Sequence, residues 1–168
     1  GVQTCALPIF IKCDELEQYS RRNNIRISGI KEKQGENTDD IVLQIANDIM
    51  DVPITLCDID RSHRVGPKAD SKKRDILVKM MSYRNKREIV QNKKKLKTNK
   101  IDDLDTSHTF INDDLTRRRS NLLYKARLMK RNGEINDTWS TDGRILIKDK
   151  ANKIFPITSL TDLAKHIM

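Results

Sequence analysis

The sequence predicts an α+β protein in which two small domains follow the end of an N-terminal helix. Helical and strand patterns succeed one another as β-α-β-β-α-β over residues 24–112, and a helix, a hairpin and a closing helix follow over residues 113–168. Aromatic residues make up 4% of the chain, so we expect cores built mainly from aliphatic side chains. The length of 168 residues fits one large domain or two small ones, and the element order favours two.

A helix is expected over residues 10–22, and a strand begins directly after it. The strand, residues 24–30, alternates apolar with polar side chains. Leu16 and Tyr19 fit the a and d positions of one heptad, a pattern typical of a coiled coil but too short to establish one. We interpret residues 10–23 as the end of a coiled-coil stalk.

Two more helices and three more strands complete the first predicted domain. Asn37 or Thr38 is placed to cap a helix with a broad apolar stripe, and Pro53 ends that helix. Ser82 is placed to cap a second helix that runs to about residue 96. The remaining predicted strands are residues 58–65, 75–81 and about 109–112. This order is the ferredoxin-like arrangement.

The second domain is predicted to begin with a helix capped by Asp113 or Asp114. This helix covers residues 115–131 and ends at Asn132-Gly133, a common helix stop. The sequence Thr-Asp-Gly at 141–143 is a hairpin signal. The other predicted elements are a strand containing Trp139, which we expect in the core, strands at 144–148 and 153–157, and a helix at 158–167.

Charge is distributed unevenly along the chain. Residues 1–70 carry 9 Lys/Arg and 12 Asp/Glu, whereas residues 71–168 carry 24 and 12, within a total net charge of +9. A basic C-terminal half favours a polyanionic partner, and we expect nucleic acid. A membrane surface fits less well, because no predicted helix pairs a broad apolar face with a basic one. No apolar run approaches the roughly 20 residues of a membrane span.

The cysteines predict neither a disulfide framework nor a metal site. Cys13 and Cys57 stand alone, with no CxxC pair and no Cys/His cluster at zinc spacing. We therefore expect free, buried thiols in a reducing compartment, and no cofactor.

Residues 1–9 are expected to be foreign to the protein. They read, codon by codon, as a translated sequencing-library adapter, and no initiating Met precedes them. A short apolar arm and a signal peptide are the alternatives, but the apolar run is short and no basic segment precedes it. We leave these residues out of the fold prediction and expect the natural stalk to extend further upstream.

Clustered cations supply candidate nucleic-acid contacts in the stalk and the first domain. Arginine presents a planar fork that matches phosphate, and lysine presents a mobile point charge. Helical ion pairing or a solvated surface are the alternatives. The candidates are Arg21, Arg22, Arg26, Arg61, Arg64, Lys72, Lys73 and Arg74.

A helical stripe supplies most of the candidates in the second domain. Arg117, Tyr124 and Arg131 are seven residues apart and share one helix face, whereas Arg119 falls nearer the apolar face. Tyr124 is placed either to stack on an unpaired base or to pack against the neighbouring domain. The full set is Arg117, Arg118, Tyr124, Arg127 and Arg131 on the helix, with Arg144 and Lys148 on one side of a strand.

An enzyme is not expected. The adjacent pairs Asp39-Asp40, Asp102-Asp103 and Asp113-Asp114 suggest a two-metal nuclease. Neighbouring carboxylates point apart on a strand, however, and two of these pairs fall where helix caps are needed. The sequence contains no Gly-rich phosphate loop and no motif that marks a catalytic histidine.

Five segments together resemble the first-open-reading-frame proteins of LINE-type (non-LTR) retrotransposons, in order and in spacing. They are EQYSRRNNIRISGI (17–30), IDRSHRVG (59–66), RDILVK (74–79), FINDDLT (110–116) and DGRILIK (142–148). The resemblance covers about residues 16–168. It implies a trimerising coiled-coil stalk, an RNA-recognition-motif domain at 24–112 and a basic nucleic-acid-binding domain at 113–168.

The chain departs from the usual recognition motif in one respect. The strand at 75–81 and the first strand carry no aromatic side chain on which a base could stack. We therefore expect binding through phosphate contacts, which carry little sequence information.

The resemblance also implies a function. Such proteins bind single-stranded RNA and DNA, package the RNA of their element into a ribonucleoprotein particle and act as nucleic-acid chaperones. Cytoplasmic particles are the expected location, with the nucleus as a second one. The alternative is a host-derived structural or adaptor protein that uses the stalk and the domain surfaces for protein contacts.

Overall fold

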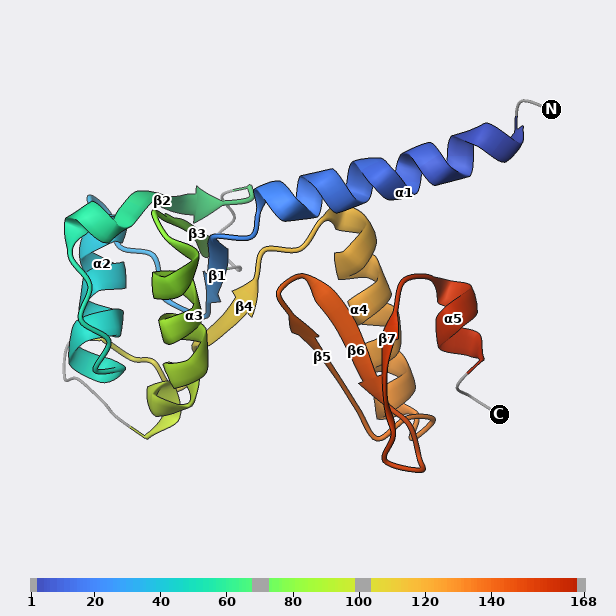
Figure 1. Cartoon of the computed structure of the whole chain (residues 1–168). Helices are drawn as coiled ribbons and strands as arrows, with labels where there is room; N and C mark the ends of the chain where they lie inside the picture. Colours follow the sequence, from blue (N-terminus) through green and yellow to red (C-terminus); the bar gives the residue numbers. More distant parts are fainter. Residues whose placement is uncertain (1–2, 68–72, 99–103, 166–168) are drawn as a thin grey trace. The chain divides into compact units, whose positions relative to one another are not determined.

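The computed structural model describes residues 3–67, 73–98 and 104–165. The chain forms two compact units (Figure 1). The middle unit is Asn23–Asp114, and the terminal unit combines Gly1–Arg22 with Leu115–Met168. In the described residues, no helix is both long and apolar enough to span a membrane.

The middle unit is a four-stranded antiparallel sheet with two helices. Its strands are β1 (Asn24–Ser28), β2 (Ile59–Val65), β3 (Asp75–Met80) and β4 (Phe110–Asp113), in the spatial order β2-β3-β1-β4. The helices are α2 (Thr38–Gln44), continued by a π-helical turn at Ile45–Ile49, and α3 (Tyr83–Asn92), continued by a 3-10 turn at Lys93–Lys97. A further 3-10 turn, Leu56–Asp58, precedes β2. The predicted β-α-β-β-α-β order is confirmed.

One core holds this unit together. Ile25 and Ile27 of β1 are buried, as are Ile76 and Val78 of the neighbouring strand β3. They form a single aliphatic cluster with residues of α2 and α3, including Ile89. Both helices therefore cover the same face of the sheet, and the opposite face carries the alternate residues of each strand.

Element boundaries differ from the predicted ones by one to three residues at most ends. The side chain of Asn37 caps α2 by accepting a hydrogen bond from the Asp39 N–H, and Ser82 caps α3 in the same way at Asn85. The π-helical turn that continues α2 ends at Ile49, before the predicted stop at Pro53, and Asp51 between them adopts a left-handed φ of 53°.

The terminal unit packs helices against a three-stranded sheet. Its helices are α1 (Gln3–Ser20), α4 (Arg117–Arg131) and α5 (Leu160–Ala164). The strands β5 (Asp137–Thr141), β6 (Arg144–Lys148) and β7 (Ile154–Ile157) pair antiparallel in chain order. The core combines Leu122, Ala126 and Met129 of α4 with Ile145 and Ile147 of β6.

Three predictions about this unit need correction. Thr116, not Asp113 or Asp114, caps α4, because its hydroxyl accepts the Arg119 N–H, while Asp113 belongs to β4 and Asp114 is a buried acceptor for Asn24 and Arg26. The helix predicted at 158–167 is shorter and capped by Ser159, and residues 166–168 lie outside the described part of the chain. Helix α1 begins at Gln3 rather than at residue 10, within the segment interpreted as adapter.

Candidate nucleic-acid interface

Helix α4 presents a cationic face to solvent. Arg117, Tyr124 and Arg131 are exposed, and Tyr124 keeps 54% of its surface accessible. The opposite face, with Leu122 and Ala126, is buried, so the two faces predicted for this helix are confirmed. Arg127 is also exposed and lies close to this row of side chains, whereas Arg118 is exposed on the adjoining side of the helix.

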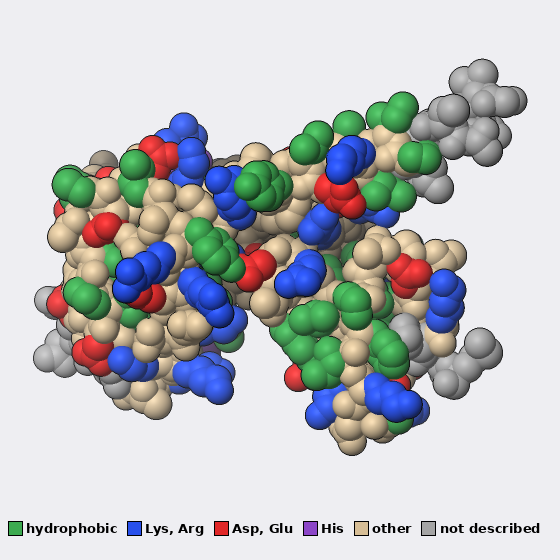
Figure 2. All heavy atoms as spheres, viewed as in Figure 1, with side chains coloured by type: hydrophobic (Ala, Val, Ile, Leu, Met, Phe, Trp, Pro, Cys, Tyr) green, Lys and Arg blue, Asp and Glu red, His purple; other side chains and the backbone are tan. Residues whose placement is uncertain are grey.

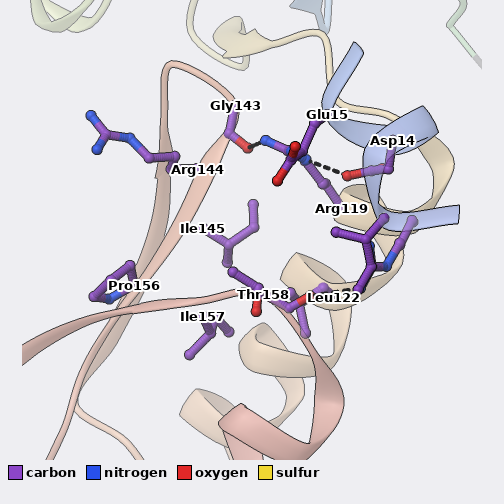
Figure 3. A pocket seen from close by; sticks show the side chains of 12 residues that line it. Asp14, Glu15, Arg119, Leu122, Gly143, Arg144, Ile145, Pro156, Ile157 and Thr158 are labelled. Atoms are coloured by element: carbon purple, nitrogen blue, oxygen red, sulfur yellow. Dashed lines mark hydrogen bonds and ion pairs between the residues drawn. The ribbon is translucent and has the colours of Figure 1, made fainter. Parts of the chain in front are cut away.

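Arg119 points inward and joins α4 to α1 and to the β5–β6 turn. Its Nε lies 2.8 Å from Asp14 Oδ2, and one of its terminal nitrogens donates to the Gly143 carbonyl at 2.9 Å (Figure 3). The Thr116 hydroxyl also donates to Asp14. Gln18 accepts the Thr116 backbone N–H at 3.0 Å. We call these five residues the α1 latch.

The electrostatics of the α1 latch favour an ionised carboxylate. Burial alone would raise the pKa of Asp14, but hydrogen bonds from Thr116 and Arg119 outweigh it. The positive charges of Arg119 and Arg118 act in the same direction, so the pKa of Asp14 lies below its ordinary value. The latch explains why the structure groups α1 with the C-terminal residues rather than with the strand that directly follows it.

Beside the latch lies a small hollow of about 250 Å³. Leu122, Ile145 and Ile157 line its floor, and Arg144 extends away from Arg119 at its edge (Figure 3). Arg118 donates to the Thr158 carbonyl at 3.1 Å and so fixes its guanidinium at the same rim. The apolar floor is continuous with the core of the unit, and we read this hollow as part of the packing of α1 on α4.

The open face of the three-stranded sheet carries an aromatic residue that was predicted to lie in the core. Trp139, Leu146 and Pro156 are paired in register across the three strands, while Thr138 and Ile145 are buried on the other side. Trp139 is only partly buried and lies outside the aliphatic core cluster. The alternation of side chains along the strand explains this position, because the core residues of β6, Ile145 and Ile147, lie on the opposite face of the sheet.

Cations flank this apolar row. Arg144 and Lys148 lie on the same face of β6 as Leu146, as their spacing predicted. Figure 2 shows hydrophobic side chains gathered over β5 and β6, with lysine and arginine side chains next to them. An aromatic ring with nearby cations on an open sheet face suits stacking of an unpaired base.

The structure removes Arg64 from the candidate interface. Only 5% of its side chain is exposed, and its guanidinium forms a fork with the Glu36 carboxylate at 2.7 and 3.1 Å. It also donates to the carbonyls of Ile30, Lys31 and Arg74, so that all five of its N–H donors are used. A guanidinium satisfied in this way has no donors left for a phosphate.

Several other candidates are already engaged by protein groups. Arg26 lies between Asp114 at 3.0 Å and Asp75 at 3.6 Å, and Arg74 forms a fork with Glu32. The remaining contacts are those of Arg21 with Glu17 and the Leu115 carbonyl, Arg22 with the Tyr19 ring and carbonyl, and Lys73 with the Gly29 carbonyl. Lys72 lies outside the described residues.

An aromatic residue that was not among the predicted contacts lies on the open face of the four-stranded sheet. Phe110 of β4 is 51% exposed, and it pairs with Ser28 while the neighbouring Ile111 is buried. On the same face, Arg61 of β2 pairs with Lys79 of β3. The alternation of an exposed Phe with a buried Ile was the signal available in the sequence.

The described residues contain no cluster of three or more His, Cys, Asp or Glu side chains able to hold a metal ion. Asp39 and Asp40 occupy the first turn of α2, where carboxylates complement the helix dipole. Asp102 and Asp103 lie outside the described part.

No protein-family model matches this chain, and no curated protein sequence matches it significantly.

Proposed function

We propose that this chain binds single-stranded RNA and DNA with little sequence preference. The observation that carries the proposal is the exposed face of α4, where Arg117, Arg127 and Arg131 lie on the same side of the helix as Tyr124. The open sheet face with Trp139 adds a second place where cations adjoin an aromatic ring. Phosphate contacts supply salt-dependent affinity, and stacking adds affinity that every base can provide.

The proposal extends to the fold and the biological role implied by the resemblance. The order β2-β3-β1-β4 with both helices on one face supports an RNA-recognition-motif domain in the middle unit. The exposed Leu16 and Tyr19 support a coiled-coil trimer through an extended α1. In this role the protein coats retrotransposon RNA in cytoplasmic, and also nuclear, ribonucleoprotein particles and acts as a nucleic-acid chaperone.

Affinity as a function of salt tests the proposal. Unrelated single strands of equal length should bind with similar affinity, with a log–log slope against salt of about −0.7 for each phosphate neutralised. Fluorescence anisotropy with labelled oligonucleotides measures both. A salt-insensitive complex, or strong preference for one short sequence, would contradict this binding mode. Absence of binding at low salt would instead favour the adaptor protein.

A further inference from the structure

A groove runs between α1 and α4 within the terminal unit. Its volume is about 950 Å³, at the upper end of the range of small-molecule sites. Helix α1 lies across the start of α4, where the α1 latch fixes it (Figure 1). The residues that matter here are Phe10, Cys13 and Glu17 from α1, and Arg117, Asn121 and Tyr124 from α4.

The groove is cationic even though two acidic residues line it. Glu17 pairs with Arg21 at 2.6 Å, and Asp14 pairs with Arg119 at 2.8 Å. Their charges are therefore balanced by arginines, while Arg117 is exposed at the groove. An anionic ligand fits this charge distribution.

Aromatic and polar side chains line the same groove. Tyr124 lies on α4, two turns after Arg117, and Phe10 contributes from α1; both rings are largely exposed. Asn121 lies between Arg117 and Tyr124 along α4 and offers an amide with both donor and acceptor. A phosphate, a hydrogen-bonding edge and a flat ring are the features that these groups recognise together, and a single-stranded nucleotide carries all three.

We infer that the α1–α4 groove is a nucleotide-binding site for single-stranded nucleic acid, in which Arg117 holds a phosphate and Tyr124 stacks on a base. The inference rests on the proposed function and adds that the stalk helix forms one wall of the site. Strand binding and the docking of α1 are then coupled, and each favours the other.

The thiol of Cys13 reports directly on occupancy of the groove. Both thiols were expected to be buried, but the structure exposes them: Cys13 lines the groove, whereas Cys57 belongs to the middle unit. In the full chain carrying Cys5→Ser, N-ethylmaleimide should alkylate Cys13 severalfold more slowly with a saturating 20-nucleotide single strand. The rate at Cys57 should not change. Mass spectrometry of the tryptic peptides gives both rates.

Substitutions in the groove test whether the slower alkylation of Cys13 comes from the proposed contacts. Tyr124→Ala should lower affinity roughly tenfold to hundredfold and remove most of the protection at Cys13, while Tyr124→Phe keeps the ring and should retain both. Asp14→Asn distinguishes a structural role of α1 as a wall of the groove from a general effect of charge. Loss of an acidic group alone would tighten polyanion binding, whereas loosening of the α1 wall should weaken both binding and protection.

The outcomes separate this inference from the proposed function. Salt-dependent binding with no protection at Cys13, or with equal protection at Cys57, overturns the groove and leaves the proposed function standing. Protection by polyglutamate as strong as that by the oligonucleotide assigns the groove to an acidic protein segment and overturns the inference. Absence of binding at low salt defeats both.

Discussion

At the scale of single residues, the α1 latch concentrates most of the polar chemistry of the terminal unit. Asp14 and Arg119 are each mostly withdrawn from solvent, with 10% and 20% of their side chains exposed. Gln18 is buried and holds the N-terminus of α4. Groups desolvated in this way cost free energy when one partner is removed, because the other is left without its hydrogen bonds.

Asp14→Asn should destabilise the terminal unit by about 1–3 kcal/mol, because it leaves Arg119 without its counter-charge. Glu15→Gln is the matched control, since Glu15 is an exposed neighbour paired only with Lys12 at 3.4 Å among the contacts of the described residues. Urea unfolding followed by circular dichroism measures both. Equal, small effects of the two substitutions would contradict the importance of the latch.

The same latch should weaken in acid. The folded-state pKa of Asp14 is lowered, so its contribution to stability is fully present above the ordinary carboxyl pKa of about 4. The contribution is lost as the pH falls through the folded-state pKa. Urea midpoints between pH 6 and pH 2.5 should therefore drop less in Asp14→Asn than in the unchanged chain. If the urea midpoints of the two chains fell in parallel with pH, ionisation of Asp14 would make no contribution to stability.

Gly143→Ala should also destabilise this unit, for two reasons. Gly143 has a φ of +76°, which costs an L-residue about 1–2 kcal/mol, and a Cβ there would lie 2.6 Å from Gln18 Cγ. Gly133→Ala is the control, because Gly133 has a φ of +72° with open space around it. The two substitutions share the backbone cost, so the difference between their thermal unfolding midpoints measures the clash with Gln18. Equal midpoints would mean that the Gln18 side chain moves away freely.

At the scale of elements, α4 has two separable roles. Its buried face builds the core with β6, and its exposed face carries the cations. Because the two faces share no side chain, binding and stability should respond to different substitutions. This separation makes α4 a good element on which to test nucleic-acid binding.

Arg117→Gln and Arg131→Gln should each weaken single-strand binding and reduce the magnitude of the salt slope by about 0.7, with an unchanged melting temperature. Arg84→Gln is the control, because Arg84 is an exposed arginine of α3, on the covered side of the other sheet. Anisotropy titrations at several salt concentrations give the slopes. A control that weakens binding as much as the α4 variants would indicate a general charge effect.

At the scale of the whole molecule, α1 has a docked face and a free face. The docked face carries Asp14 and Gln18, whereas Leu16 and Tyr19 are 62% and 65% exposed. We propose that the free face meets further copies of the chain, while the docked face attaches the rest of the basic terminal unit to the same helix. Each added copy would therefore bring another cationic α4 to a shared strand.

A trimeric coiled coil appended in register with Leu16 and Tyr19 should raise the affinity for long single strands by roughly 10²–10⁴, because later contacts become intramolecular. The chain without it should be a monomer. The control is the same coil joined one residue out of register. Sedimentation gives the oligomeric state and strand-annealing kinetics the activity. A stable trimer without the coil, or no gain with it, would contradict the role of the stalk.

Local pattern in the sequence determined the elements, the helix faces and the uneven charge. The spacing of Leu122, Ala126 and Met129 against Arg117, Tyr124 and Arg131 was sufficient to assign both faces of α4, because helical geometry fixes which residues share a side.

Only the tertiary structure decided which of these side chains remain available. Arg64, predicted to contact nucleic acid, is buried in an ion pair, and Trp139, predicted in the core, lies on the open face of its sheet. Burial of each depends on strand register and on partners far apart in the chain. The docking of α1 was equally invisible, because its contacts join residues 98–105 positions apart. Periodicity records which residues share a face, but it holds no information about which distant element will meet that face.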